Sequence, residues 1–234
     1  MHQNTRLLLC LFLTLLVLFI SSAAFGQSSE PDRFYLGLEV GPIIPRSASS
    51  NLAGTITGSG SVKFNASGFV GLLVGYRFTD HLGAEAHAGW TLYDSHDLIG
   101  TFSRSGAALP GDIPLNGDMH TWLGLVNLLY RPRRESARLS PYIGAGAGAA
   151  GLEWLIDSRP GGNIIIDLRG GSLSAAVDVI GGADYALTKR FSLGGRYNFV
   201  RVISDIPAVS GGGITLTHNA PALHLLQMTG TYRF

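Results

Sequence analysis

Cysteine, charge and long apolar runs are all scarce in this chain of 234 residues. Cys10 is the only cysteine, so the chain cannot form an internal disulfide. Charged residues make up 14%, against about 25% in ordinary soluble domains. Lys and Arg number 17 and Asp and Glu 16, which excludes the basic excess typical of nucleic-acid-binding proteins. Beyond the N-terminal region no stretch of 18 apolar residues exists, so no membrane-spanning helix is expected there.

The N-terminal region has the order of a secretory signal peptide. Arg6 precedes an apolar run from Leu7 to Ile20, and small residues follow up to Gly26. This pattern predicts export and cleavage before Gln27, leaving a mature domain of residues 27–234. A membrane anchor is the alternative, but the run is shorter than the roughly 20 residues that a spanning helix needs. The mature chain would contain no cysteine, so hydrogen bonds and packing must stabilise it.

Apolar residues recur at every second position along most of the remaining chain. Phe34, Leu36, Leu38 and Val40 form one face of the first such stretch, which predicts a β-strand with two different faces. Similar alternation predicts about eight strands in all. They begin near Phe34 and at about residues 64–78, 82–93, 120–131, 139 onward, 174–187, 191–202 and 222–234.

The connections between these strands differ in length in a regular way. Short turns follow the second, fourth and sixth strands, whereas long polar loops are expected at about residues 42–63, 94–118, 153–173 and 203–221. No segment has the 3.6-residue period of a crossover helix, so neighbouring strands should pair antiparallel. Short turns at one end and long loops at the other are typical of outer-membrane β-barrels.

Charged residues in the strands determine which face is which. An arginine on the lipid face of a barrel costs about 2–4 kcal/mol at the bilayer midplane, so the strand arginines should point inward. Carboxylates and amides occupy the same face, and acids and bases inside a narrow barrel should pair with each other. The expected lumen charge network consists of Glu39, Arg77, Glu85, Asn127, Arg131, Asp178, Asp184, Arg196 and Arg233. A solvated face of an ordinary soluble sheet is the alternative, but it would not explain the export signal.

Tyr-Arg pairs recur at corresponding strand ends. Tyr76, Tyr130 and Tyr232 all lie on the short-turn side, with Tyr185 in an equivalent position, and we expect them to form an aromatic girdle at one membrane interface. Trp90 and Trp122 lie nearer the opposite rim.

The alternation, the export signal and the terminal Phe234 together resemble the small outer-membrane β-barrels of Gram-negative bacteria, of the OmpA/OmpX type. The matching C-terminal residues are Leu226, Met228, Tyr232 and Phe234. The resemblance implies that Tyr232 and Phe234 belong to the strand that the barrel-assembly machinery recognises. It also implies that this last strand pairs with the first, which closes the barrel and removes every exposed sheet edge.

Three motifs suggest other functions. Gly146 to Gly151 matches G-x-G-x-x-G, but the following residues predict a strand and not the helix that a dinucleotide site needs. Asp94, His96 and Asp97 could meet a divalent cation, although such a loop cluster is more typical of solvated surface residues. The lipid-modifying barrels that the fold resembles use a His-x-Ser pair, and neither His218 nor His224 begins one.

These observations predict an all-β, closed, antiparallel, up-and-down transmembrane β-barrel of about eight strands, monomeric and integral to the bacterial outer membrane. Its interior should be largely filled by side chains. The expected function is a structural or surface-interaction role through the long loops, with outer-membrane lipid and the assembly machinery as partners and no cofactor, metal or catalytic residue. A narrow pore or small-molecule conduit is the alternative, and a lipid-modifying enzyme is a further one.

Overall fold

The computed structural model describes residues 33–109, 111–132, 138–158, 167–203, 205–211, 213–219 and 222–234. Every regular element within these ranges is a β-strand. The predicted signal peptide lies outside the described residues. The strands are β1 (Phe34–Pro45), β2 (Ala48–Gly54), β3 (Ile56–Phe64), β4 (Ser67–Arg77), β5 (Leu82–Arg104), β6 (Ala107–Ala108), β7 (Asp112–Tyr130), β8 (Leu139–Ser158), β9 (Asp167–Ala186), β10 (Phe191–Val202), β11 (Asp205–Gly211), β12 (Ile214–Asn219) and β13 (Ala222–Arg233).

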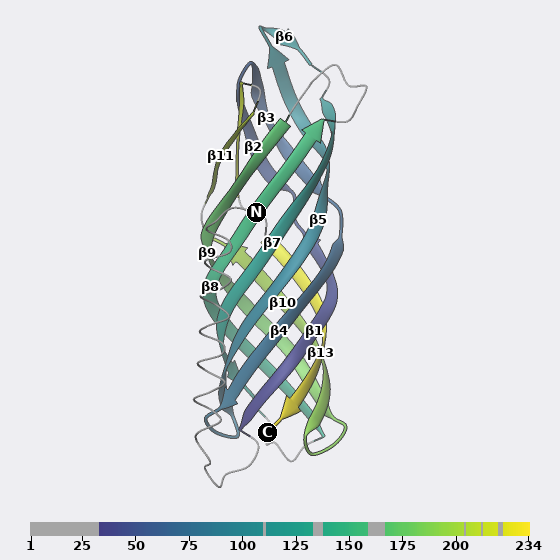
Figure 1. Cartoon of the computed structure of the whole chain (residues 1–234), viewed down its shortest axis with the longest axis vertical. Helices are drawn as coiled ribbons and strands as arrows, with labels where there is room; N and C mark the ends of the chain where they lie inside the picture. The colour runs from purple at the N-terminus through teal and green to yellow at the C-terminus, as the bar shows by residue number, and fades with distance from the viewer. Residues whose placement is uncertain are drawn as a thin grey trace.

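Eight of these strands close into one antiparallel barrel, and the strands are tilted relative to the barrel axis (Figure 1). The ring runs β1–β4–β5–β7–β8–β9–β10–β13 and returns to β1. The first and last strands pair from Tyr35 opposite Arg233 to Pro45 opposite Leu223, and the amide of Phe234 donates to the carbonyl of Phe34 at 3.1 Å. The predicted closed eight-stranded barrel is therefore confirmed, and its last strand has a hydrogen-bonded neighbour on each side.

The barrel has a short-turn end and an extended end. At the short-turn end, Thr79 and Thr188 each accept hydrogen bonds from backbone amides two and three residues later, which fixes two tight turns. At the extended end, β5, β7, β8 and β9 continue beyond the barrel. There the short strands β11, β12, β2 and β3 pair in that order, and β3 pairs with β5. We refer to this continuation of the wall as the outer extension.

The four long segments expected to be loops are largely strands, so this part of the sequence-based prediction is wrong. Residues 42–63 contain the end of β1 and nearly all of β2 and β3, and residues 203–221 contain β11 and β12. The physical reason is pairing between segments far apart in the chain: β12 pairs with β2, from Ile214 opposite Gly54 to His218 opposite Ser50. These strands satisfy each other's backbone groups, which a local reading of a polar sequence cannot foresee.

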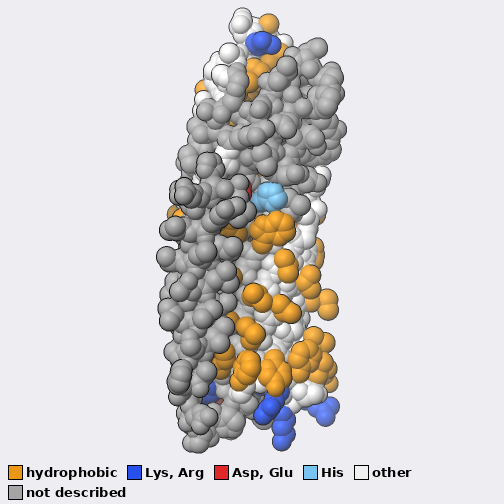
Figure 2. Space-filling model, in the orientation of Figure 1, with side chains coloured by type: hydrophobic (Ala, Val, Ile, Leu, Met, Phe, Trp, Pro, Cys, Tyr) orange, Lys and Arg blue, Asp and Glu red, His pale blue; other side chains and the backbone are white. Residues whose placement is uncertain are grey.

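The outside of the barrel carries a band of exposed apolar side chains. Leu38, Val126 and Met228 are 63%, 63% and 69% exposed, far above what a soluble core would permit. On the face seen in Figure 2, hydrophobic side chains gather over the barrel and Lys or Arg side chains lie at the short-turn end. A continuous apolar exterior of this kind marks a surface that contacts lipid.

The inside of the barrel is divided into two zones. Toward the short-turn end the buried inward residues are mostly polar or charged, among them Glu39, Glu85 and Arg196. Toward the extended end the inward residues form an apolar cluster that includes Phe69, Leu123 and Leu225. Among the described residues, no helix is long and apolar enough to cross a membrane.

Candidate functional site: the polar lumen

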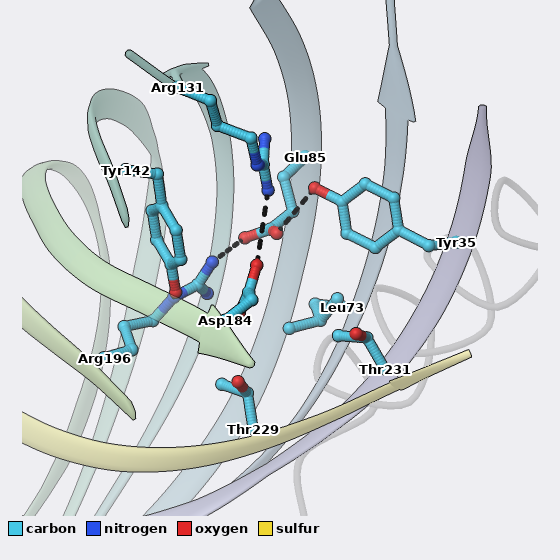
Figure 3. Close-up of a pocket in the computed structure, with 9 residues that line it drawn as sticks. All are labelled: Tyr35, Leu73, Glu85, Arg131, Tyr142, Asp184, Arg196, Thr229 and Thr231. Carbon is cyan, nitrogen blue, oxygen red and sulfur yellow. Dashed lines mark hydrogen bonds and ion pairs between the residues drawn. The ribbon is translucent and has the colours of Figure 1, made fainter. Parts of the chain in front are cut away.

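Arg196 is at the centre of the polar zone. It points inward from β10, between the outward Gly195 and Tyr197, and its side chain is 1% exposed. Its Nη1 donates to Glu39 Oε1 at 2.5 Å, its Nη2 donates to Glu85 Oε1, and its Nε donates to the Tyr142 hydroxyl at 3.2 Å. These three partners come from β1, β5 and β8, so one guanidinium links four strands across the lumen. Figure 3 shows Arg196 with Glu85 and Tyr142.

The two carboxylates that bind Arg196 have further partners. Glu39 Oε2 lies 2.7 Å from His87 Nε2 and accepts from Gln227 Nε2 at 3.3 Å. Glu85 Oε2 accepts from the Tyr35 hydroxyl at 3.0 Å. Burying a carboxylate is costly unless it is paired and its remaining lone pairs are satisfied. Both acids meet that condition, so the polar zone is a connected network and not a set of isolated charges.

A second ion pair lies beside this network. Arg131 Nη2, just after the end of β7, is 3.7 Å from Asp184 Oδ2 of β9, and the Arg131 guanidinium lies over the ring of Tyr142 at 5.2 Å and near that of Tyr35 at 5.9 Å. Tyr142 also lies under Arg196, at 5.6 Å. The Tyr142 ring therefore lies within reach of a favourable cation–π interaction with both guanidiniums.

All nine residues expected in the lumen network are buried and inward-facing in the structure. Arg196 contacts both Glu39 and Glu85 directly, and Arg131 pairs with Asp184. The others lie around this centre. Asn127, with its amide nitrogen toward Asp178, donates to that carboxylate at 2.8 Å. Arg77 lies over the Tyr35 ring at 5.8 Å, and Arg233 donates to the Ser192 hydroxyl at 3.5 Å.

Three members of the network were not foreseen from the sequence: Tyr35, His87 and Tyr142. Tyr35 and His87 share strand parity with an expected member, because Tyr35 precedes Glu39 by four residues and His87 follows Glu85 by two. That parity was the available indication. It shows which face a residue occupies but not which strand faces it across the lumen.

Little free space remains at this level. The cavity bounded by Tyr35, Glu85, Arg131, Tyr142 and Arg196 has a volume of about 10 Å³, roughly enough for one water molecule (Figure 3). Glycines opposite the large rings make this packing possible: a Cβ at Gly75 would collide with the Tyr35 ring, and one at Gly182 would lie 2.6 Å from Tyr142. Side chains therefore leave little space around Arg196 at this level of the lumen.

The four girdle tyrosines all face outward near the short-turn end. Tyr76, Tyr130, Tyr185 and Tyr232 are 40%, 50%, 44% and 42% exposed. Phe234 extends the same ring of aromatics, with its centroid 5.2 Å from Tyr232 and 5.9 Å from Phe34. Trp90 lies eight residues after Leu82 in β5, toward the extended end. Its ring stacks on that of His120, with centroids 5.6 Å apart.

The other motifs do not form a site in the described part of the chain. Gly146 to Gly151 lies wholly within β8, so no helix opens there. Of the acidic cluster, the side chains of Asp94 and His96 lie outside the described residues. No group of three potential metal ligands occurs among the residues that the structure describes.

Comparison with known proteins gives one family and several structures. Residues 11–234 match the model of the outer membrane protein beta-barrel domain. No curated protein sequence matches the chain. Among solved structures, OprG from Pseudomonas aeruginosa is similar with a TM-score of 0.58 and 13% identity, covering 88% of this chain and 98% of that one. A major outer membrane protein from Thermus thermophilus has a TM-score of 0.51 and 13% identity, covering 86% and 99%. The outer membrane protease OmpT from Escherichia coli has a TM-score of 0.51 and 10% identity, covering 90% and 99%. At these identities the likeness shows the fold alone.

Proposed function

The chain belongs to the family of outer membrane protein beta-barrel domains, and from this premise we propose that it is a non-conducting barrel with a structural or surface-interaction role. The protein is integral to the outer membrane. In this fold the short turns face the periplasm and the long connections face outward, so the outer extension faces the cell exterior.

The observation that carries the proposal is the Arg196 network. An ion crossing the barrel would have to pass the guanidinium that joins Glu39, Glu85 and Tyr142 across the lumen. Separating a buried ion pair costs several kcal/mol because each charge is left without its partner. An eight-stranded barrel is in any case only wide enough for its own side chains or for one small ligand.

The outer extension supplies a surface for the second half of the proposal. Most of its exposed outward residues are small, polar and uncharged, as are Ser49, Asn51, Thr57, Ser59, Thr101 and Thr217. Ile99 and Lys63 are exceptions. Hydrogen-bonded strands hold these hydroxyl and amide groups in fixed rows. Such a surface suits recognition by hydrogen bonding, and it favours no highly charged partner.

Planar-bilayer recording of the folded protein tests the proposal. The unmodified chain should give no steady conductance steps, whereas the triple variant Glu39→Ala, Glu85→Ala, Arg196→Ala should give small, reproducible ones because the network that closes the lumen is gone. Steady steps from the unmodified chain would overturn the closed-barrel proposal in favour of a pore.

One observation favours a second candidate function, a conduit or binding site for a small apolar molecule. The apolar cluster in the outer half of the lumen contains Phe69, Leu123, Leu125 and Leu225, all of which point inward. A fluorescent apolar probe should bind if this zone opens, and Leu123→Asn should weaken that binding. Absence of saturable binding would remove this candidate.

We also propose that the chain is not an enzyme. Catalysis by a nucleophile requires a base within hydrogen-bond reach of it. His224 instead lies on the lipid-facing side, where its Nδ1 is 2.7 Å from the Tyr197 hydroxyl. Incubation with outer-membrane lipids should leave them unchanged by mass spectrometry, and a cleaved or transferred acyl chain would contradict this. The proposed partners are outer-membrane lipid and the barrel-assembly machinery, with the protein as a monomer.

A further inference from the structure

A groove crosses the lipid-facing surface of four neighbouring strands. Its volume is about 510 Å³, and its outward lining comes from Pro42 of β1, Gly181 of β9, Gly195 and Tyr197 of β10, and Leu226 and Met228 of β13. Gly181 and Gly195 make it hollow, because a Cβ at either position would meet no atom within 4 Å. The groove is thus an apolar recess in a surface that is otherwise covered by large side chains.

A hydrogen-bonded pair lies along the extended-end side of this groove. The Tyr197 hydroxyl and His224 Nδ1 are 2.7 Å apart, and the Phe199 ring packs on the imidazole with centroids 5.1 Å apart. Tyr197 and His224 face lipid, a position where polar groups are tolerated near an interface and costly at the midplane. The chain therefore places a polar pair where hydrocarbon gives way to head groups.

Two arginines lie just beyond that pair. The amide of Arg46 donates to the carbonyl of Ala222 at 2.9 Å, and Arg201 is the register partner of Ala222 on its other side. Because neighbouring strands are about 4.8 Å apart, the two backbones are about 10 Å apart. Both side chains are exposed, and neither is ion-paired with a carboxylate among the described residues. Lys63, another exposed cation, is the register partner of Asp97 in β5.

The depths of these features match one leaflet of a membrane. Arg201 follows Phe191 by ten residues along β10, or about 33 Å along the strand and about 25 Å along the axis at a 40° tilt. That is about the height of the apolar band of an outer-membrane barrel, so Arg201 lies at its outer edge. Gly195 lies about 15 Å below Arg201 on the same basis, which is half of a hydrocarbon core of about 30 Å.

We propose that this surface is a binding site for a phosphate-bearing lipid of the outer leaflet. One acyl chain lies in the groove over Gly181 and Gly195. The phosphate lies between Arg46 and Arg201, where each guanidinium can donate two hydrogen bonds to it. The Tyr197–His224 pair faces the polar linkage between head group and chain. The site is on the outside of the barrel and is independent of whether the lumen conducts.

Native mass spectrometry tests the site. The folded full barrel is mixed with purified lipid A in detergent, and the lipid that stays bound after the detergent is removed in the spectrometer is measured. The unmodified protein should retain lipid A and should retain its dephosphorylated form much less. Arg46→Gln with Arg201→Gln should lower retention by about twenty-five-fold, since each cation contributes roughly fivefold near a charged surface. Gly181→Leu with Gly195→Leu should lower it independently by filling the groove.

Two matched variants separate a site from general lipid adhesion. Lys189→Gln with Arg190→Gln removes the same charge at the opposite end, and Ala86→Leu enlarges an exposed outward residue on β5; both should retain lipid A normally. Folding of every variant is checked by heat-modifiable gel migration. Equal retention of phosphorylated and dephosphorylated lipid, or equal losses in the matched variants, would overturn the proposal.

Discussion

At the scale of single residues, the structure depends on which side chains face each other across the lumen. Arg196 is bound by Glu39, Glu85 and Tyr142, and glycines at facing positions leave room for the rings of Tyr35 and Tyr142. A buried network of this kind tolerates the loss of all its charges better than the loss of one, because a remaining charge has no solvent to stabilise it.

Removal of Arg196 alone should therefore be strongly destabilising. We expect Arg196→Met to lower the free energy of unfolding by about 3–5 kcal/mol, because Glu39 and Glu85 lose their shared cation while staying buried. Urea unfolding in lipid vesicles measures this change. Lys189→Ala, at an exposed turn, serves as the control and should change stability by less than about 0.5 kcal/mol. A similar small change in Arg196→Met would show that the network contributes little.

A glycine substitution tests the packing of the aromatic rings. Gly75→Ala should cost about 1–3 kcal/mol, because its Cβ would occupy the position of the Tyr35 ring and displace the hydroxyl from Glu85. Gly68→Ala, on the same strand with open space around its Cβ, is the matched control. The temperature at which the folded gel band disappears gives the comparison; equal temperatures for the two variants would contradict the predicted ring contact.

At the scale of elements, alternation predicted the barrel strands but not the outer extension. The range 191–202 coincides with β10, and the parity of Glu39, Glu85 and Arg196 placed them correctly on the inward face. β2 and β3 are rich in Ser, Gly and Thr, and they are strands because β12 and β5 pair with them from far along the chain. The alternation shows which face of a strand a residue occupies but not which strands lie opposite each other across the lumen. The contacts of Tyr142 and His87 could therefore not be predicted from it.

The strand character of the outer extension has a direct consequence for hydrogen exchange. The backbone amides of β2 and β3 around the Ser50–Gly60 and Leu52–Gly58 pairs should exchange slowly, because each of these two strands is hydrogen-bonded to a neighbouring strand on both sides. Exchange followed by mass spectrometry of peptides covering residues 48–64 measures this. Exchange as fast as in an unstructured peptide would show that these segments are loops after all.

At the scale of the whole molecule, the barrel combines an apolar exterior with an interior of two kinds. The half toward the short-turn end contains the ion pairs of Arg196 with Glu39 and Glu85, and the half toward the extended end contains apolar side chains such as Phe69 and Leu123. The sequence-based prediction placed a charge network in the lumen without dividing the interior into zones, so the apolar half toward the extended end is the main difference. In β7 the inward residues of this half, such as Leu123 and Leu125, alternate with outward apolar residues such as Val126 and Leu128. Both faces are therefore apolar there, and polar positions do not indicate which face is inward.

The most direct test of this two-sided arrangement is a nitroxide scan along β13 in lipid vesicles. Single cysteines introduced from Leu225 to Tyr232 would carry the spin label, because the only native cysteine, Cys10, lies in the predicted signal peptide. Collision with oxygen, which concentrates in hydrocarbon, should peak at Leu226, Met228, Gly230 and Tyr232 and fall at the residues between them. A flat profile, or strong collision of a water-soluble relaxation agent at positions 226 and 228, would contradict the account.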